Sequence, residues 1–182
     1  MDVIQTKLKD CFILQPKIFE DKRGYFFESF NENTFHQLTG SNTTFVQDNE
    51  SFSTKGVLRG LHYQTGKHAQ AKLVRVIKGS VLDVAVDLRK ESNTFGQHIS
   101  VELTESNKKQ LFVPRGFAHG FIVLSDTAIF SYKCDNYYNK ASEAGIIYND
   151  KDLNIDWKLN ENQFLVSEKD EILPSFKNAI LS

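Results

Sequence analysis

Short runs of β-branched and aromatic residues, separated by polar turns, recur along most of the chain. They predict strands at Gly24–Phe30, Phe45–Phe52, Val57–Gln64, Leu73–Ile77, Val81–Leu88, His98–Thr104, Gln110–Val113, Phe121–Leu124 and Thr127–Cys134. The connectors, such as Lys78-Gly79-Ser80 and Ser125-Asp126, are short and polar. Many short strands joined in this way predict a β-sandwich or a closed barrel.

Helical signals are few. Asn31 is placed to cap a short helix that runs through Leu38 and ends at Gly40. The sequence from Ser167 to Asp170 resembles a capping box ahead of Pro174. We expect a single domain over 1–182, with an N-terminal arm of about 1–30, a barrel core of about 31–140 and a C-terminal tail of about 141–182.

Composition supports a folded β-rich domain. Of the 182 residues, 40% are hydrophobic and 25% are charged, and 15 Phe and 6 Tyr stand against one Trp and one Met. The formal net charge is -1, with acidic and basic residues interspersed. We therefore expect no binding to nucleic acid, although a few converging Arg and Lys side chains can still bind a small anion.

The cysteines and the hydropathy pattern bear on the cellular compartment. Cys11 and Cys134 lie far apart in apolar surroundings, which is typical of buried thiols in a reducing compartment, and we expect no disulfide. The segment Met1 to Gln15 lacks the pattern of a signal peptide, and no apolar run is long enough for a membrane span. We expect a cytoplasmic protein without membrane contact.

Alternation between 47 and 53 produces a polar stripe, because Gln47, Asn49, Ser51 and Ser53 share one face of the predicted strand. Most polar stripes of this kind face solvent. The alternative is a barrel interior lined to hold a polar ligand. The pattern alone leaves both interpretations open.

Arg59, Gly60 and His62 interrupt an otherwise apolar strand. Strict alternation places Arg59 and His62 on opposite faces, whereas a bulge at Gly60 would bring both into one cavity. A strand histidine is most often structural, but histidine is also suited to proton exchange near neutral pH. Many barrels of the cupin type bind metals through a His-x-His pair, and Gln64 stands where the second histidine would be. Because His119 alone does not complete a ligand set, we expect no metal.

Four other residues each admit an ordinary structural role. His119 follows Gly116 in a predicted glycine-rich turn, which is either a tight barrel corner or a point where the backbone closely approaches a ligand. Lys72 is next to apolar residues and is the lysine best placed to point inward. Tyr132 fits a core tyrosine, and Asp170 fits the capping box.

Several motifs, taken in order, resemble dTDP-4-dehydrorhamnose 3,5-epimerases. They are Phe19-x-Asp21-x-Arg23-Gly24, Gln47-Asp48-Asn49, Val57-Leu58-Arg59-Gly60-Leu61-His62, Lys72-Leu73-Val74-Arg75, Asp83-Val84-Ala85-Val86-Asp87 and Gly116-Phe117-Ala118-His119-Gly120-Phe121. The resemblance extends over nearly the whole chain, to Lys169-Asp170. It implies a mainly β, cupin-like antiparallel jelly-roll barrel with a few short helices.

The resemblance also implies a reaction. Epimerases of this family invert C3 and C5 of dTDP-4-dehydro-6-deoxy-glucose, both next to the C4 ketone, to give dTDP-4-dehydro-L-rhamnose for dTDP-L-rhamnose and cell-surface polysaccharide. No cofactor is needed. By resemblance, His62 is the base, Asp170 orients its imidazole, Tyr132 is the acid and Lys72 stabilises the enolate.

The resemblance extends to substrate binding and assembly. The matching positions are Phe19, Arg23, Glu28, Gln47, Asn49, Arg59, His119, Tyr138, Glu143 and Lys169. Arg59 and Arg23 would bind the diphosphate, and Tyr138 would stack on thymine. A homodimer is implied, in which the partner's N-terminal arm supplies part of the pocket. The alternatives are a C3-only or C5-only epimerase, a sugar 3,4-ketoisomerase, a sugar-binding cupin without turnover and a metal-dependent oxygenase.

Overall fold

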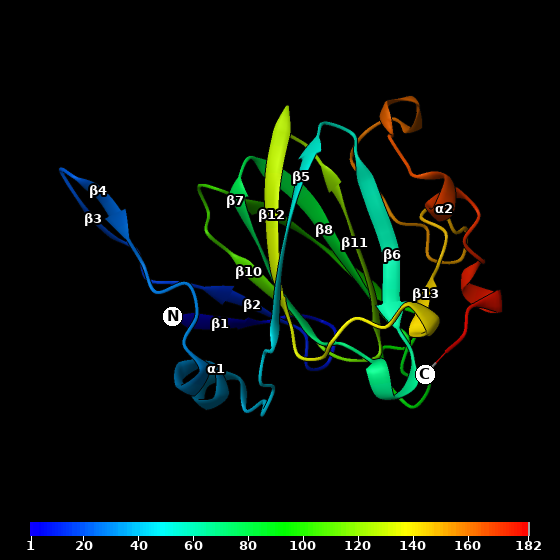
Figure 1. Cartoon of the computed structure of the whole chain (residues 1–182), viewed down its shortest axis with the longest axis horizontal. Helices are drawn as coiled ribbons and strands as arrows, with labels where there is room; N and C mark the ends of the chain where they lie inside the picture. The colour runs from blue at the N-terminus through cyan, green and yellow to red at the C-terminus, as the bar shows by residue number, and fades with distance from the viewer. Residues whose placement is uncertain (182) are drawn as a thin grey trace.

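Two antiparallel sheets face each other in the computed structural model, which describes residues 1–181 (Figure 1). The six-stranded sheet has the order β1 (Asp2–Gln5), β2 (Phe12–Gln15), β10 (Gln110–Val113), β7 (Lys72–Lys78), β12 (Thr127–Cys134) and β5 (Gln47–Thr54). The five-stranded sheet has the order β13 (Glu143–Gly145), β6 (Leu58–Gln64), β11 (Phe117–Val123), β8 (Ser80–Asp87) and β9 (His98–Thr104). This arrangement is a cupin-like jelly roll, and the predicted fold class is confirmed.

The helices are short and lie outside the sheets. They are α1 (Glu32–Thr39), α2 (Glu168–Glu171) and the 3-10 turns η1 (Gly66–His68), η2 (Lys140–Ser142), η3 (Glu161–Gln163) and η4 (Phe176–Asn178). The Asn31 side chain caps α1, and Gly40 ends it with a φ of 70°. The side chain of Ser167 caps α2 by accepting from the backbone N–H of Asp170. Both predicted helices are thus confirmed. Within residues 1–181, no helix combines the length and hydrophobicity that crossing a membrane requires.

Three apolar clusters fill the spaces on either side of the two sheets. The cluster between the sheets includes Val74 and Phe130, whose neighbours along the strands point the other way. Phe35 of α1 packs on the outer face of the six-stranded sheet. Trp157 and Leu153 of the C-terminal tail cover the outer face of the five-stranded sheet. Segments outside the sheets thus cover part of each outer face.

A small hairpin stands away from the barrel (Figure 1). It consists of β3 (Phe19–Asp21) and β4 (Gly24–Phe26), and all of its strand residues are exposed. The predicted strand Gly24–Phe30 is therefore shorter than expected and pairs with a strand that the apolar pattern did not reveal. β1 and β2 were also not predicted, and they join the six-stranded sheet. The free-standing part of the expected arm is thus the hairpin alone.

The prediction of a glycine-rich turn before Phe121 is wrong. Only Gly116 lies in a turn, with a φ of 81°, and β11 already begins at Phe117. Gly120 is a strand residue on which a Cβ atom would lie 2.7 Å from the carbonyl oxygen of Arg59. The glycine is required by close contact between two backbones rather than by a barrel corner.

Candidate active site

A bulge in β6 brings two predicted site residues to the same side of the sheet. His62 lies opposite His119, but Arg59 lies opposite Phe121, so β6 carries one more residue than β11 between these pairs. Gly60, at a φ of 129°, provides the extra residue. Arg59 and His62 consequently line one cavity, as the bulge hypothesis predicted.

His62 is held by a carboxylate from the far end of the chain. Nε2 of His62 lies 2.6 Å from Oδ1 of Asp170, and the other oxygen, Oδ2, accepts the backbone N–H of Gly60 at 3.2 Å. Burial alone would raise the pKa of Asp170, but the hydrogen bond from His62 and its charge, with that from Gly60, outweigh burial and lower it. An ionised carboxylate only accepts hydrogen bonds, so Nε2 of His62 is the donor in this pair, and Nδ1 is the ring nitrogen that can exchange a proton with a ligand.

Tyr132 and Lys72 approach the cavity from the opposite sheet. They lie on the neighbouring strands β12 and β7, with the Lys72 ammonium 6.0 Å from the centre of the Tyr132 ring. Burial is the main cause that raises the pKa of Tyr132, so its hydroxyl is protonated at neutral pH. Burial also lowers the pKa of Lys72, which points inward as expected and forms no ion pair within residues 1–181. His62 and Tyr132 therefore line one cavity from opposite sheets.

The polar stripe of β5 lines the same interior. Gln47, Asn49, Ser51 and Ser53 are all less exposed than the residues between them, which resolves the alternative in favour of interior lining. The Ser51 hydroxyl is shielded from solvent yet has no hydrogen-bond partner within residues 1–181. It was part of the predicted stripe but was not singled out as a site residue. An unpaired buried hydroxyl at a cavity wall is suited to a polar ligand.

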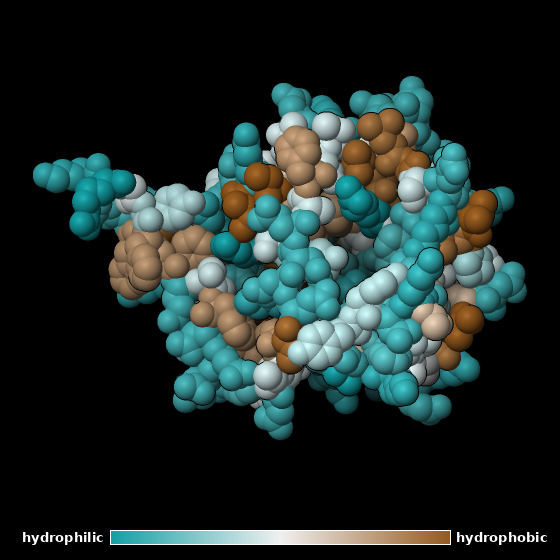
Figure 2. All heavy atoms as spheres, in the orientation of Figure 1, coloured by the Kyte–Doolittle hydropathy of each residue, from teal (hydrophilic) through white to brown (hydrophobic). Residues whose placement is uncertain are grey.

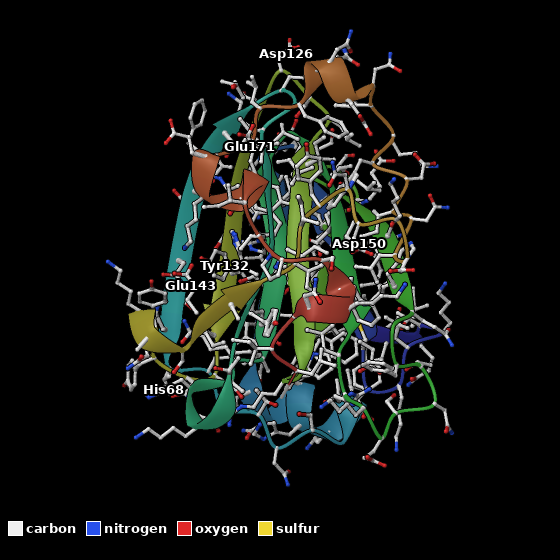
Figure 3. All side chains as sticks on the ribbon, turned by 90° about the vertical axis from the view of Figure 1, so that its right-hand side faces the viewer. His68, Asp126, Tyr132, Glu143, Asp150 and Glu171 are labelled. Carbon is white, nitrogen blue, oxygen red and sulfur yellow. The ribbon has the colours of Figure 1, made fainter. Side chains whose placement is uncertain are left out.

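The cavity consists of two adjoining hollows of about 480 and 360 Å³ that share His62, Lys72 and Tyr132. Between them they are lined by these three residues and by the predicted site residues Gln47, Asn49, Arg59, His119, Tyr138, Glu143, Lys169 and Asp170. Figure 2 shows a hollow on this face of the molecule, with hydrophilic residues on its flanks and hydrophobic residues above it. In Figure 3, Tyr132 and Glu143 lie close together at the middle of the molecule, far from Asp126 at its upper end.

A polar rim surrounds the second hollow. Glu143 on β13 accepts a hydrogen bond from the hydroxyl of Tyr138 at 3.0 Å and forms an ion pair with Lys169. The hydrogen bond from Lys169 is the main cause that lowers the pKa of Glu143. The Tyr138 ring is 55% exposed, so one of its faces is available to a flat ligand. Two chain segments far apart in sequence, the one from Tyr138 to Glu143 and the one that carries Lys169, thus meet at one edge of the cavity.

A second histidine–carboxylate pair was not foreseen. Nε2 of His119 lies 3.0 Å from both oxygens of Asp83, which is completely buried. The available signal was an aspartate in the apolar strand Val81 to Val86, because a buried charge needs a partner. Asp83 fixes the ring of His119 where it lines the first hollow.

Three predicted site residues lie outside the cavity of their own chain. Phe19 and Arg23 belong to the exposed hairpin, where the Arg23 side chain is paired with Asp21. Glu28 follows the hairpin and accepts a hydrogen bond from Asn31. The structure therefore separates the predicted residues into a cavity group and an arm group.

The cavity is equipped for proton transfer. Within residues 1–181, no three His, Cys, Asp or Glu side chains are arranged to hold a metal ion. A histidine base oriented by a carboxylate, a neutral tyrosine on the facing wall and a buried lysine are the groups needed to remove and return a proton next to a carbonyl group. The fold and the cavity define a jelly-roll isomerase.

Comparison with known proteins gives the family. A sequence profile of dTDP-4-dehydrorhamnose 3,5-epimerase matches residues 5–178. The chain is 53% identical to the dTDP-4-dehydrorhamnose 3,5-epimerase of Salmonella typhimurium over 182 residues, covering 100% of this chain and 99% of that protein. The chain belongs to the dTDP-4-dehydrorhamnose 3,5-epimerase family.

Solved structures agree with this assignment. The crystal structure of the Elizabethkingia anophelis dTDP-4-dehydrorhamnose 3,5-epimerase is 60% identical, with a TM-score of 0.95 over 98% of this chain and 97% of that one. The Legionella pneumophila enzyme, in complex with dTDP-4-keto-L-rhamnose, is 49% identical, with a TM-score of 0.94 over 97% of this chain and 93% of that one. A Streptomyces bikiniensis 3'-monoepimerase, in complex with dTDP-quinovose, is 31% identical, with a TM-score of 0.88 over 96% and 87%. Relatives that invert different numbers of centres thus share this fold.

Proposed function

We propose that this chain inverts both C3 and C5 of dTDP-4-dehydro-6-deoxy-glucose to give dTDP-4-dehydro-L-rhamnose in dTDP-L-rhamnose biosynthesis. The observation that carries the proposal is the entry of the His62–Asp170 pair and of Tyr132 into one cavity from opposite sheets. Inversion at carbon requires removal of a proton from one face and its return to the other. A base and an acid on facing walls meet this requirement.

In the proposed mechanism, Nδ1 of His62 removes the proton next to the C4 ketone. The C–H electron pair then forms the enolate double bond, and the negative charge moves to the C4 oxygen. Asp170 stabilises the imidazolium that results. Lys72 donates to the enolate oxygen from within the cavity, where the low dielectric strengthens that hydrogen bond.

Tyr132 completes the inversion. Its hydroxyl protonates the carbon from the opposite face, and the raised pKa keeps that proton in place until the enolate forms. The ketone is then restored, and the tyrosinate and the imidazolium return to their starting states by proton exchange. The same groups act on C3 and C5 in turn, because both carbons flank the same ketone.

The remaining cavity residues hold the nucleotide. Arg59, whose Nε donates to the hydroxyl of Ser53, presents its other guanidinium nitrogens to the diphosphate. His119 binds at the sugar or phosphate. Gln47, Asn49 and Tyr138 bind the nucleoside, and Glu143 with Lys169 closes the edge of the pocket.

We further propose a homodimer in the cytoplasm. The exposed hairpin carries Phe19 and Arg23. Phe19 lies opposite Phe26, and the two are 55% and 70% exposed, so they form an apolar pair of the kind that marks an interaction site. Insertion of this hairpin into the partner's cavity mouth would bury Phe19 and bring Arg23 and Glu28 to the nucleotide. The two cysteines are free and buried, which suits a reducing compartment.

Proton NMR of the purified protein with dTDP-4-dehydro-6-deoxy-glucose in deuterated water tests the activity. Loss of both the C3 and C5 hydrogen signals, with L-rhamnose formed after coupled reduction, is the expected result. Loss of one signal alone would establish a single-centre epimerase, the alternative favoured by the 31% identical 3'-monoepimerase. Loss of neither would leave a binding protein.

A further inference from the structure

Lys108, in the turn between β9 and β10, contacts the hairpin. Its ammonium donates to the Tyr25 hydroxyl at 2.8 Å, lies 4.2 Å from the centre of the Tyr25 ring and lies 5.9 Å from that of Phe27. Among the hydrogen bonds and cation–aromatic contacts of residues 1–181, the contact with Tyr25 is the one that joins the hairpin strands to the barrel. Lys108 is therefore placed to control the direction in which the hairpin leaves the barrel.

The backbone at Lys108 adopts a conformation that glycine would occupy with less strain. Its φ is 54°, in the left-handed region that few residues with a side chain adopt. A non-glycine residue in this region is often retained for what its side chain does. The lysine side chain here is only half-exposed and lies on an aromatic ring. The strained backbone at Lys108 thus accompanies a side chain that is held in a defined position.

The turn that carries Lys108 is firmly attached to the barrel. The side-chain oxygen of Asn107 accepts the backbone N–H groups of Thr104 and Lys109, and Thr104 Oγ1 accepts the N–H of Asn107. Gln15 of β2 donates to the carbonyl of Asn107 at 2.9 Å. Lys108 therefore projects from a turn that is well attached to the barrel. Its contact with Tyr25 holds the hairpin in a fixed position relative to that turn.

The segment after the hairpin is anchored separately. The Arg75 guanidinium lies 5.5 Å from the Phe27 ring centre, and Gln110 donates to the carbonyl of Ser29 at 2.7 Å. These contacts fix where the arm leaves the barrel, whereas Lys108 acts further out, on β4 itself. The two sets of contacts differ in place: Arg75 and Gln110 hold the segment that follows β4, whereas Lys108 holds Tyr25 within β4.

We propose that Lys108 is a positioning residue for the reaction: by holding Tyr25, it aims the hairpin so that Phe19 and Arg23 enter the active site of the partner subunit. This inference rests on the proposed sharing of the arm between subunits. Lys108 touches no substrate in this arrangement and acts only through the hairpin.

The test compares Lys108→Gly, Lys108→Arg and wild type. Substitution by glycine removes the contact with Tyr25 and also the strain of the positive φ, so the melting temperature should be unchanged or higher. Loss of one cation–aromatic contact and its hydrogen bond should raise KM for the nucleotide sugar about fivefold, with kcat within about twofold. Trypsin cleavage after Lys22 or Arg23 should accelerate by a similar factor. Lys108→Arg should restore both values, because a guanidinium also lies favourably on an aromatic ring.

Lys109→Ala is the matched control, since it removes a neighbouring charge of the same turn, and it should behave as wild type. A wild-type KM and a wild-type cleavage rate in Lys108→Gly would overturn the proposal, as would a fall in melting temperature parallel to the rise in KM. Arg23→Ala separates the two hypotheses. If Arg23→Ala leaves KM unchanged, the shared site is wrong, and faster cleavage of Lys108→Gly alone would then support the aiming of the hairpin.

Discussion

The cavity and the hairpin differ in how their side chains are held. In the cavity, His62 is fixed by Asp170 of α2 and His119 by Asp83 of β8. Both histidines stand on strands that have a hydrogen-bonded neighbour on either side. In the hairpin, all strand residues are exposed, and the Arg23 side chain is 83% exposed. The proposed groups for proton transfer lie in the cavity of one chain, whereas Phe19 and Arg23 lie outside it on the exposed hairpin. The molecule therefore divides its predicted site residues between a buried cavity and an exposed hairpin.

The largest effect is expected from His62→Ala, which removes the proposed base from the cavity. Its kcat should fall by about 10⁴-fold, the upper range for general acid–base catalysis. The melting temperature should also fall, because the buried Asp170 carboxylate loses its hydrogen-bond partner, so activity is measured well below it. Deuterium exchange at C3 and C5 measures the loss. Exchange at a wild-type rate at either carbon would show that another group is the base.

Asp170→Asn should lower kcat by about 10²-fold, because an amide at this position no longer enforces the tautomer with a basic Nδ1. Ser167→Ala is the matched control. It removes the cap of α2, whose oxygen accepts the Asp170 backbone N–H at 3.3 Å, and keeps the carboxylate. A fall in melting temperature without a change in kcat is expected for the control. A lower melting temperature with an unchanged kcat in Asp170→Asn would show that Asp170 serves only in the capping of α2.

Arg23→Ala tests the hairpin by itself. Loss of one charge-assisted contact with the diphosphate should raise KM about tenfold. The value of kcat and the melting temperature should stay at wild-type levels, since the side chain is exposed and distant from the reacting atoms. Initial rates across substrate concentrations measure the effect. A fall in kcat at an unchanged KM would place Arg23 in the chemistry and erase the distinction between the two regions.

The smallest effect on activity is expected from Asp87→Asn, in a region that belongs to neither group. Burial alone would raise the pKa of Asp87, but hydrogen bonds from Arg89, Ser92 and Thr94 lower it from 3.8 to about 2. Because the folded-state pKa is the lower one, the carboxylate stabilises the fold above about pH 4, and this contribution is lost as the pH falls towards 2. Thermal unfolding between pH 2 and 7 should show a stability gap between wild type and variant that narrows on acidification. A stability difference that stays the same at every pH would contradict the proposed contribution of the ionised Asp87 carboxylate.

Periodicity predicted the parts of the molecule that one chain segment determines. The alternation of β5 separated its two faces but left open which of them is buried, and Asn31 and Gly40 marked both ends of α1. The short strands β1 to β4 were missed or misplaced because three or four residues are too few for a period to emerge. Gly120 was taken for a turn residue because the sequence does not reveal which backbone passes close to it.

For the site, too, the sequence predicted only what a single chain segment determines. The resemblance identified the residues, but no local pattern joins His62 to Asp170 or His119 to Asp83, since the partners come from separate segments that only the folded barrel brings together. Ser51 was within the predicted stripe, yet its lack of a hydrogen-bond partner is a property of its three-dimensional surroundings. The positive φ of Lys108 is equally invisible in a sequence.

Mixed dimers test most directly whether each active site combines the cavity of one chain with the hairpin of the other. Co-expression of a His62→Ala chain and an Arg23→Ala chain with different tags yields a heterodimer with one cavity that has His62 and faces an intact partner hairpin. We predict about half the wild-type kcat per dimer, with the wild-type KM. If the heterodimer instead has the raised KM of Arg23→Ala, the hairpin serves its own chain and the account of a shared site is wrong.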